Sequence, residues 1–322
     1  MIEAQEVNET MRTEPYLIVG LGELLWDLLP SGQQLGGAPA NFAYHAALLG
    51  DQGIIASRVG QDALGHEALQ RLERLGLDTS YVQRDATYPT GTVHVQVDEE
   101  GRPDFTIVEN VAWDHMQWTP QWQELARKAD AVCFGSLAQR SPQSRATIQQ
   151  FLRATRPDAL RIFDVNLRQS FYSAAVLSES LSLSRVAKLN SDELPRLMAV
   201  LGLGDDGLVE GERRLLHDFG LELVCVTRGA DGSVLVTRER AVAHPGFKVK
   251  VADTVGSGDA FTAALAHYYL RHASLEEINE AANRLGAWVA TQVGATPVIA
   301  RDELRRLMAE EKAPWRSDQA RA

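Results

Sequence analysis

The sequence predicts an α/β protein of three layers, in which helices cover both faces of a mostly parallel central sheet and a small antiparallel β lid is added. Short apolar runs alternate with longer segments of helical period along most of the chain, which is the pattern of βαβ units. Two segments break this alternation, and one of them has the two-residue period of a hairpin. With 322 residues, 45% of them hydrophobic, the chain is long enough to bury a large core.

The first two βα units lie in the N-terminal quarter of the chain. The apolar run Tyr16–Gly20 predicts a buried strand, and Ala40–Leu49 carries apolar residues at helix spacing. Gly53–Val59 predicts a second strand. Ala63–Leu75 has leucines at helical spacing with charged residues between them, which predicts an amphipathic helix.

The segments that break the alternation predict the lid. Leu24–Leu29 follows the first strand almost directly, and valines alternate strictly in Thr90–Val97. A DEEGRP turn then leads into Phe105–Glu109, which is a hairpin signal. We expect residues of about 24–36 and 90–113 to form a lid over a site. An edge extension of the main sheet is the alternative interpretation.

The rest of the chain returns to alternating strands and helices. Near the C-terminus, two long helices are predicted, one over Asp259–His272 and one with an apolar stripe from Leu275 to Val289. We expect one domain over residues 1–322, because no linker divides the chain. We expect flexible tails at 1–14 and 312–322. Four more strands are predicted, at Ala131–Phe134, Arg161–Asp164, Val186–Asn190 and Leu223–Thr227.

Charge and composition exclude several classes of function. Acidic residues number 43 and basic residues 32, so the net charge is −11, which is unsuited to binding the nucleic-acid backbone. No stretch approaches 18 uninterrupted apolar residues, and the first fourteen residues have no apolar core of a signal peptide. Two cysteines, Cys133 and Cys225, lie in apolar runs without metal-ligand spacing. We therefore expect a cytoplasmic protein with no membrane or nucleic-acid partner.

The most informative motif is VADTVGSGDAF, from Val251 to Phe261. Its small residues let backbone N–H groups turn toward one point at a helix N-terminus, which forms an anion hole for a transferring phosphoryl group. Asp259 follows in the first turn, where a carboxylate can accept a proton from an attacking hydroxyl. An aspartate at this position is also a common N-cap, so that interpretation stays open for the motif alone. The small residues before it are Gly256, Ser257 and Gly258.

A second glycine-rich motif, QLGGAPANFAYHAALLG, starts at Gln34 and opens a predicted helix. A polar ligand can approach Gly36 and Gly37 closely, and Asn41 projects from the first turn to hydrogen-bond it. Asp27, on the segment before, is an acceptor suited to adjacent sugar hydroxyls. A tight turn and a local cap are the structural alternatives.

Other polar residues follow predicted strands, at the sheet edge where ligands bind in open α/β folds. Asn190 and Glu193 offer oxygen atoms for a hydrated Mg²⁺, and Arg168 offers a clamp for phosphate or substrate oxygens. Gly229 and Gly232 form a turn after the strand Leu223–Thr227, which suits either a nucleotide loop or a simple hairpin. For Asn190, Glu193 and Arg168, a purely structural role is an equally weighted alternative.

In this order, the motifs resemble those of the ribokinase-like carbohydrate kinases of the phosphofructokinase-B type. The resemblance covers about Leu17 to Pro297 and rests on two signatures, GGAPANFAYHAALLG and DTVGSGDAF. It implies a ribokinase-like fold and an ATP-dependent sugar kinase. It also implies that Asp259 is the catalytic base, that the GSG turn is the anion hole, and that the sugar is held by Asp27, Gly37 and Asn41.

The resemblance further implies a nucleotide site with two kinds of ion. Asn190 and Glu193 match the family's NxxE element for Mg²⁺, which Glu193 would hold through water. Asp253 lies beside the phosphates and is a candidate for a monovalent cation such as K⁺, although Val298 stands where ribokinase has a serine. The expected nucleotide contacts are Thr227, Gly229, Gly232 and, on the purine side, Asn283.

Within the family, the opening from Gly22 to Asp27, the GGAPAN segment and PTGTV resemble fructokinases. This resemblance implies phosphorylation of fructose to fructose 6-phosphate, with sugar and ATP as partners and a homodimer through the lid. Asp164, Asn166 and Arg168 match a DxNxR element of ketodeoxygluconate kinases, so that specificity and ribokinase activity stay open. A nucleoside kinase and a non-catalytic sugar-binding regulator are less favoured alternatives.

Overall fold

The main sheet of the protein has nine strands in the order β13-β12-β11-β10-β9-β8-β1-β4-β5. The computed structural model describes residues 14–30, 32–97, 103–204 and 208–309. Neighbouring strands from β11 to β5 pair in parallel, and β12 and β13 extend the edge antiparallel. The strands are β1 (Leu17–Leu21), β4 (Gln52–Gly60), β5 (Val82–Asp85), β8 (Ala131–Gly135), β9 (Leu160–Asp164), β10 (Val186–Asn190), β11 (Leu223–Thr227), β12 (Ser233–Val236) and β13 (Ala241–His244).

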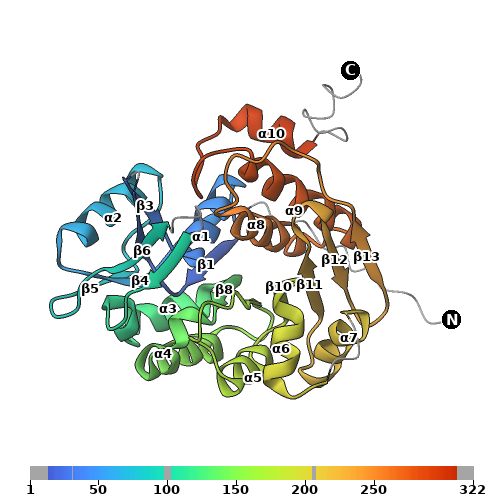
Figure 1. Cartoon of the computed structure of the whole chain (residues 1–322), viewed down its shortest axis with the longest axis horizontal. Coiled ribbons are helices and arrows are strands. Elements are labelled where there is room, and N and C mark those ends of the chain that lie inside the picture. The colour runs from blue at the N-terminus through green and yellow to red at the C-terminus, as the bar shows by residue number, and fades with distance from the viewer. Residues whose placement is uncertain (1–13, 31, 98–102, 205–207, 310–322) are drawn as a thin grey trace.

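A second sheet of four strands, in the order β3-β2-β6-β7, projects from one end of the main sheet and is the predicted lid (Figure 1). Its outer pairs, β2–β3 and β6–β7, are antiparallel as expected, whereas the central pair β2–β6 is parallel. The parallel pair arises because a βα unit of the main sheet intervenes between β3 and β6. The strands are β2 (Leu25–Leu29), β3 (Gly32–Gly36), β6 (Gly91–Val97) and β7 (Pro103–Ile107).

Helices cover both faces of the main sheet, which confirms the three layers (Figure 1). Side chains of one strand alternate between the layers: Ile18 of β1 belongs to the buried cluster that includes residues of α1, α8, α9 and α10, and Val19 belongs to the cluster that includes residues of α3 to α7. Helix α2 belongs to a third buried cluster, together with α1 and the lid strand β2. The helices are α1 (Ala38–Leu48), α2 (Ala63–Arg74), α3 (Pro120–Lys128), α4 (Pro142–Ala154), α5 (Ala174–Ser182), α6 (Glu193–Leu201), α7 (Leu208–Asp218), α8 (Ser257–Tyr269), α9 (Leu275–Ala290) and α10 (Arg301–Ala309).

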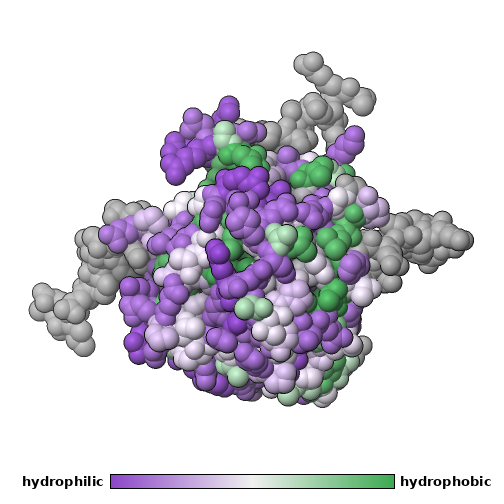
Figure 2. All heavy atoms as spheres, turned by 90° about the vertical axis from the view of Figure 1, so that its left-hand side faces the viewer, coloured by the Kyte–Doolittle hydropathy of each residue, from purple (hydrophilic) through white to green (hydrophobic). Residues whose placement is uncertain are grey.

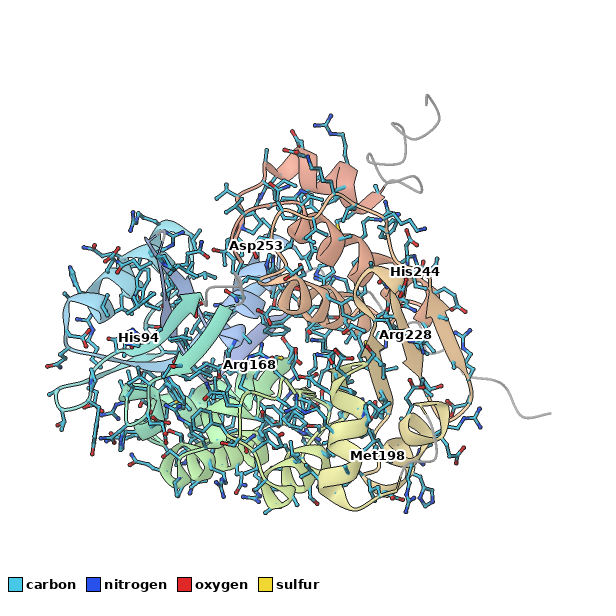
Figure 3. The ribbon with its side chains drawn as sticks, in the orientation of Figure 1. His94, Arg168, Met198, Arg228, His244 and Asp253 are labelled. Atoms are coloured by element: carbon cyan, nitrogen blue, oxygen red, sulfur yellow. The ribbon has the colours of Figure 1, made fainter. Side chains whose placement is uncertain are left out.

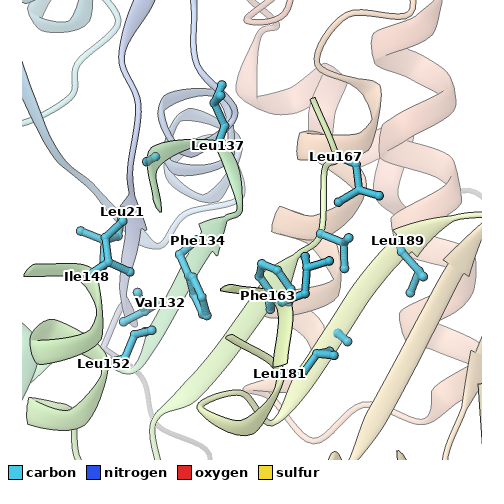
Figure 4. Close-up of a cluster of buried hydrophobic side chains, with 14 of the residues drawn as sticks. Leu21, Val132, Phe134, Leu137, Ile148, Leu152, Phe163, Leu167, Leu181 and Leu189 are labelled. Carbon is cyan, nitrogen blue, oxygen red and sulfur yellow. The ribbon is translucent and has the colours of Figure 1, made fainter. Parts of the chain in front are cut away.

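Aromatic packing at the centre of the sheet fixes the strands that lead to the site. Phe134 of β8 stacks on Phe163 of β9, with ring centroids 5.3 Å apart (Figure 4). Both rings are fully buried between the sheet and the helices of the second layer. Because β8 and β9 are parallel, this packing brings their carboxyl ends, Gly135 and Asp164, side by side.

Most predicted elements are present, with boundaries that move by one to three residues. Four strands were not predicted individually: β3, which lies inside the predicted lid range, and β5, β12 and β13, which have only four residues each. β5 has the sequence VQRD, in which only one residue is apolar, so its strand conformation depends on pairing with β4. The predicted tails lie outside the described residues except for Glu14. Within the described residues, no helix has the length and apolar character needed to cross a membrane.

Candidate active site

The GSG turn starts helix α8, as the sequence predicts. Gly256 is the N-cap and has φ of +80°, a left-handed conformation that favours glycine. A Cβ atom at Gly256 would also lie 2.6 Å from the Cα of Ala295, so the turn packs directly against that loop. The amide of Ser257 donates to the carbonyl of Thr254 over 3.2 Å. The next N–H groups of the first turn have no partner within the helix and can face an anion. Ser257 Oγ is buried and finds no hydrogen-bond partner in the described part of the chain.

Asp259 lies in the first turn of α8 and is held by Asn41 of α1. Asn41 Nδ2 donates to Asp259 Oδ2 over 2.8 Å, which joins the two glycine-rich motifs across 218 residues of sequence. Burial and the nearby Asp164 carboxylate raise the pKa of Asp259 to about 6, against the opposing effects of Asn41, Lys188 and Arg168. A carboxyl with this pKa is largely ionised at neutral pH and is a stronger base than an exposed aspartate.

Glu23, which the sequence did not indicate, is the second carboxyl near this position. It follows β1, only 3% of its surface is exposed, and its Oε2 has no hydrogen-bond partner among the described residues. Burial raises the pKa of Glu23 to about 7; the Asp259 charge adds to the rise, while backbone amides and Arg168 oppose it. Glu23 therefore titrates near neutral pH, close to the candidate base.

The predicted sugar-binding residues surround the N-terminus of α1. Gly37 has φ of +113°, and a Cβ there would collide with the backbone oxygen of Glu23. Asp27 of the lid lies over Gly36, where a Cβ would be 2.6 Å from Asp27 Oδ2. Burial raises the pKa of Asp27, and Arg168 opposes the rise, so a guanidinium group faces this carboxylate. The lid and the main sheet thus both contribute to one polar region.

Arg168 comes from the loop after β9 and is exposed. Figure 3 shows it in the middle of the molecule, between His94 of the lid and Arg228 after β11. Its charge acts on Glu23, Asp27 and Asp259, so it lies within electrostatic range of all three carboxyl groups. Its role as a clamp for substrate or phosphate oxygens stays a prediction.

A small pocket lies next to Asp259. Its polar lining comes from the ends of β9 and from α8, and its apolar lining comes from α1 and β8. Within it, Asp164 accepts hydrogen bonds from Lys188 Nζ and Thr262 Oγ1. The lining residues are Ala38, Pro39, Phe42, Cys133, Phe134, Gly135, Asp164, Asn166, Asp259 and Thr262.

The two residues predicted for Mg²⁺ form a compact backbone-capping pair. Glu193 Oε1 accepts from the amide of Leu167 over 2.8 Å, and Oε2 accepts from the amide of Asn190 over 2.9 Å. Asn190 Oδ1 in turn accepts from the amides of Asp192 and Glu193. Each carboxylate oxygen keeps a second lone pair, so Glu193 fits a hydrated ion through water better than direct coordination.

The predicted nucleotide contacts lie beyond β11, and their surroundings differ. Gly229 has φ of +57° and open space around it, whereas a Cβ on Gly232 would collide with the β13 end of the sheet. Thr227 Oγ1 donates to the carbonyl of Leu189 over 3.4 Å. The amide of Asn283 is buried and donates to Ser233 Oγ and to Asn279. The Gly229–Gly232 turn connects antiparallel strands, so the hairpin interpretation of this segment is correct, and its role as a nucleotide loop stays a prediction.

Asp253, the predicted cation residue, ties together two loops beside the GSG turn. Its Oδ1 accepts from the amide of Val255 and its Oδ2 from the amide of Gly294, both over 3.0 Å. Figure 3 places Asp253 close to α8, on the side away from Arg168. Its assignment to a monovalent cation stays a prediction.

The fold therefore brings most of the predicted residues to one edge of the sheet. Three charged residues were not predicted as functional: Glu23, Lys188, and Asp164 apart from its place in the DxNxR pattern. Asp164 and Lys188 end neighbouring strands in direct register, a position that β-strand prediction alone could have indicated. Glu23 could have been found because it is charged within the otherwise apolar run GLGELL.

Comparison with known proteins identifies the family. Residues 31–301 match the sequence profile of the pfkB family carbohydrate kinases. The chain belongs to this family. Among similar proteins, a fructokinase of Klebsiella pneumoniae is 32% identical over 89% of this chain and 97% of its own length. An aminoimidazole riboside kinase of Salmonella typhimurium is 28% identical over 87% of this chain and 90% of its own.

A solved structure of an uncharacterised sugar kinase from Pyrococcus horikoshii in complex with ATP has the same fold as this pfkB family kinase. Its TM-score is 0.78 at 29% identity, and the match covers 90% of this chain and 97% of that one. The ribokinase-like fold and the carbohydrate kinase family are thereby confirmed. The names of relatives at about 30% identity differ in their sugar or nucleoside, so they establish a sugar kinase without its substrate.

Proposed function

We propose that this pfkB family kinase transfers the γ-phosphoryl group of ATP to a primary hydroxyl of a monosaccharide, with fructose 6-phosphate formed from fructose. The observation that carries the proposal is the contact between Asn41 and Asp259 at the start of α8. It brings a carboxylate base, a glycine-rich anion site and a sugar-type polar region to the same point. The fructokinase-like GGAPAN segment supports fructose as the acceptor.

In the proposed reaction, the sugar oxygen bonds to the γ-phosphorus as the bond between that phosphorus and the β–γ bridging oxygen breaks. The hydroxyl proton passes to Asp259, and ADP leaves with the bridging oxygen. The amides of the GSG turn face the negative charge on the transferring group. Asn41 orients Asp259, and its amide hydrogen bond keeps the other carboxylate oxygen free for the proton.

Two ions belong to this proposal. Mg²⁺, when bound, would neutralise phosphate charge, and Glu193 and Asn190 would hold it through water at the end of β10. Asp253 and nearby backbone carbonyls would hold a monovalent cation such as K⁺ beside the GSG turn. For the nucleotide, we propose contacts from Thr227 and the Gly229–Gly232 turn, with Asn283 supporting the purine side from within α9.

The lid has two proposed roles. It would close over the sugar and exclude water, which otherwise competes as phosphoryl acceptor. It would also form a homodimer surface, although Figure 2, which views the molecule from the lid end, shows a mainly hydrophilic face with scattered hydrophobic groups. We propose a cytoplasmic location, supported by two buried free cysteines, Cys133 and Cys225.

The proposed function is tested by measuring ADP release from MgATP with a panel of acceptors. We expect the highest kcat/KM with fructose among fructose, ribose, ketodeoxygluconate, tagatose, glucose and adenosine. Higher activity with another sugar would contradict the fructose assignment alone. Absence of ADP release with every acceptor would contradict the kinase assignment and favour the sugar-binding regulator.

The sugar role of Asp27 gives a separate prediction. Because Asp27 lies in the lid beside Gly36 and Arg168, its change to alanine should remove contacts to the sugar and leave the nucleotide site intact. We expect the sugar KM of Asp27→Ala to rise about tenfold or more, since a hydrogen bond to a charged group is lost, with the ATP KM within about threefold. Gln33→Ala, on the adjacent exposed strand, is the control. Equal increases in both KM values would contradict the assignment.

A further inference from the structure

Beneath the GSG turn lies a buried ion pair that the proposed mechanism has not used. Asp164, the last residue of β9, is in direct register with Lys188 of β10. Lys188 Nζ donates to both carboxylate oxygens of Asp164, over 3.2 and 3.0 Å. The relative exposure of their side chains is 10% for Lys188 and 7% for Asp164. Such a pair is not required for folding, since apolar residues of similar volume are often as stable.

The pair contacts the catalytic turn itself. A Cβ atom on Gly258 would lie 3.1 Å from Lys188 Nζ, so the ammonium group packs directly under this glycine of the anion hole. The hydroxyl of Thr262, one turn further along α8, lies 2.8 Å from the carbonyl oxygen of Gly258 and 3.3 Å from Asp164 Oδ2, so these two acceptors share its single proton. The turn therefore packs on the Asp164–Lys188 pair where α8 meets the sheet.

Charge is unevenly distributed around the pair. Asp164, Asp259 and Glu193 all act electrostatically on Lys188. Burial alone would lower the pKa of Lys188, but these three carboxylates raise it above its usual value, so Lys188 stays charged. Lys188 is the buried one of the two cations that act on Asp259, and the other, Arg168, is exposed.

We propose that Lys188 is a positioning residue for phosphoryl transfer: held by Asp164 beneath Gly258, its ammonium group balances the carboxylates around the GSG turn and keeps Asp259 ionised as proton acceptor. The inference deepens the proposed kinase function and rests on it. Lys188 touches neither the sugar nor the phosphate in this role. It acts through Asp164, Gly258 and Asp259.

The two partners of the pair act on Asp259 with opposite sign. The Asp164 charge raises the pKa of Asp259, and the Lys188 charge lowers it. The other groups that face Asp259 are Asn41 of α1, Arg168 after β9 and Glu23 after β1, and all remain unchanged in the variants below. Lys188→Met should therefore raise the pKa of Asp259, whereas Asp164→Asn should lower it.

The test is the pH dependence of kcat/KM for the sugar at saturating MgATP. In the wild type we expect the acid limb near the Asp259 pKa of about 6. We expect Lys188→Met to move it up by about one pH unit, which reduces kcat/KM at pH 6 about fivefold, and Asp164→Asn to move it down. A purely structural pair would give two variants with similar loss of activity and an unmoved limb, and that result would overturn the proposal.

Two further measurements guard against trivial outcomes. The control is Asp51→Asn, which removes another buried carboxylate, one that binds His267 and Arg271 at the other end of α8. It is the same kind of substitution as Asp164→Asn, and we expect it to leave the acid limb of the pH profile unchanged. The carboxyl ¹³C shift of Asp259 follows the same titration without substrate. If the wild type phosphorylates no acceptor, the proposed function fails, and this NMR titration still decides the inference: opposite shifts support it, and no shift overturns it.

Discussion

Replacement of Asp259 by asparagine should abolish most of the activity while leaving the protein folded. Asparagine has nearly the same shape and can still accept a hydrogen bond from Asn41, so the turn should keep its geometry. It cannot take up the hydroxyl proton, and loss of a general base lowers kcat by about 10²–10⁴. The measurement is kcat with fructose and MgATP, together with the melting temperature of the variant.

The stability of the same variant makes this prediction sharper. The pKa of Asp259 is raised to about 6 from 3.8, so the folded state disfavours its charge at neutral pH. Asp259→Asn removes that unfavourable charge, and we expect its melting temperature at pH 7.5 to be equal to or above that of the wild type. Full activity would contradict the role of Asp259 as base. A large fall in melting temperature would mean that the lost activity reflects misfolding.

The sequence predicted the active site best where function lies in one short segment. Gly256, Ser257, Gly258 and Asp259 are adjacent in the chain, and a helix N-terminus follows from local rules alone. Asn41 was predicted as a sugar ligand, but its hydrogen bond to Asp259 joins segments 218 residues apart. Such a contact depends on how α1 and α8 pack side by side on the sheet. The residue spacing within either motif does not predict this packing.

The lid also contains a contact between distant segments that the sequence did not predict. The alternating valines of Thr90–Val97 predicted a hairpin with the following strand, and β6 and β7 do pair antiparallel. The pairing of β2 with β6 is parallel and joins segments about 65 residues apart, so no local pattern indicates it. The pairing of these two central strands is decided by the three-dimensional arrangement. Asp27 pairs with Val93 in the β2–β6 ladder, so its position in the site depends on this pairing.

Carboxyl groups are concentrated in the site beyond what structural stability favours. Glu23 and Asp259 both have raised pKa values because burial disfavours their charged forms. A sheet edge built only for stability would place apolar or exposed residues there. The proposed chemistry provides the reason for Asp259, since a stronger base results. Glu23 has a buried oxygen without a hydrogen-bond partner among the described residues. We therefore expect its ionised form to lower the free energy of unfolding of the protein.

We expect Glu23→Gln to be more stable than the wild type at pH 8, and the difference to shrink to about 1 kcal/mol or less at pH 5. The pKa of Glu23 is about 7 in the folded protein and 4.5 in the reference state, so folding favours the protonated form. This favourable contribution is fully present below pH 4.5 and is lost as the pH rises through 7. Ionised Glu23 then costs about 3 kcal/mol of the free energy of unfolding at pH 8, because one pKa unit corresponds to about 1.4 kcal/mol. Glutamine resembles the protonated form and avoids this cost.

The measurement is the free energy of unfolding in urea at pH 5 and pH 8 for wild type, Glu23→Gln and Asp51→Asn. Asp51 is the opposite case: burial raises its pKa, but hydrogen bonds from His267 and Arg271 lower it overall, so its charge stabilises the fold. Its contribution is present above pH 3.8 and is lost as the pH falls below that value, so Asp51→Asn should be destabilised at pH 5 and at pH 8. Only Glu23→Gln should gain on the wild type as the pH rises. A difference between Glu23→Gln and wild type that stays constant from pH 5 to pH 8 would show that Glu23 titrates outside this window, because a group with a pKa of about 7 must change its charge within it.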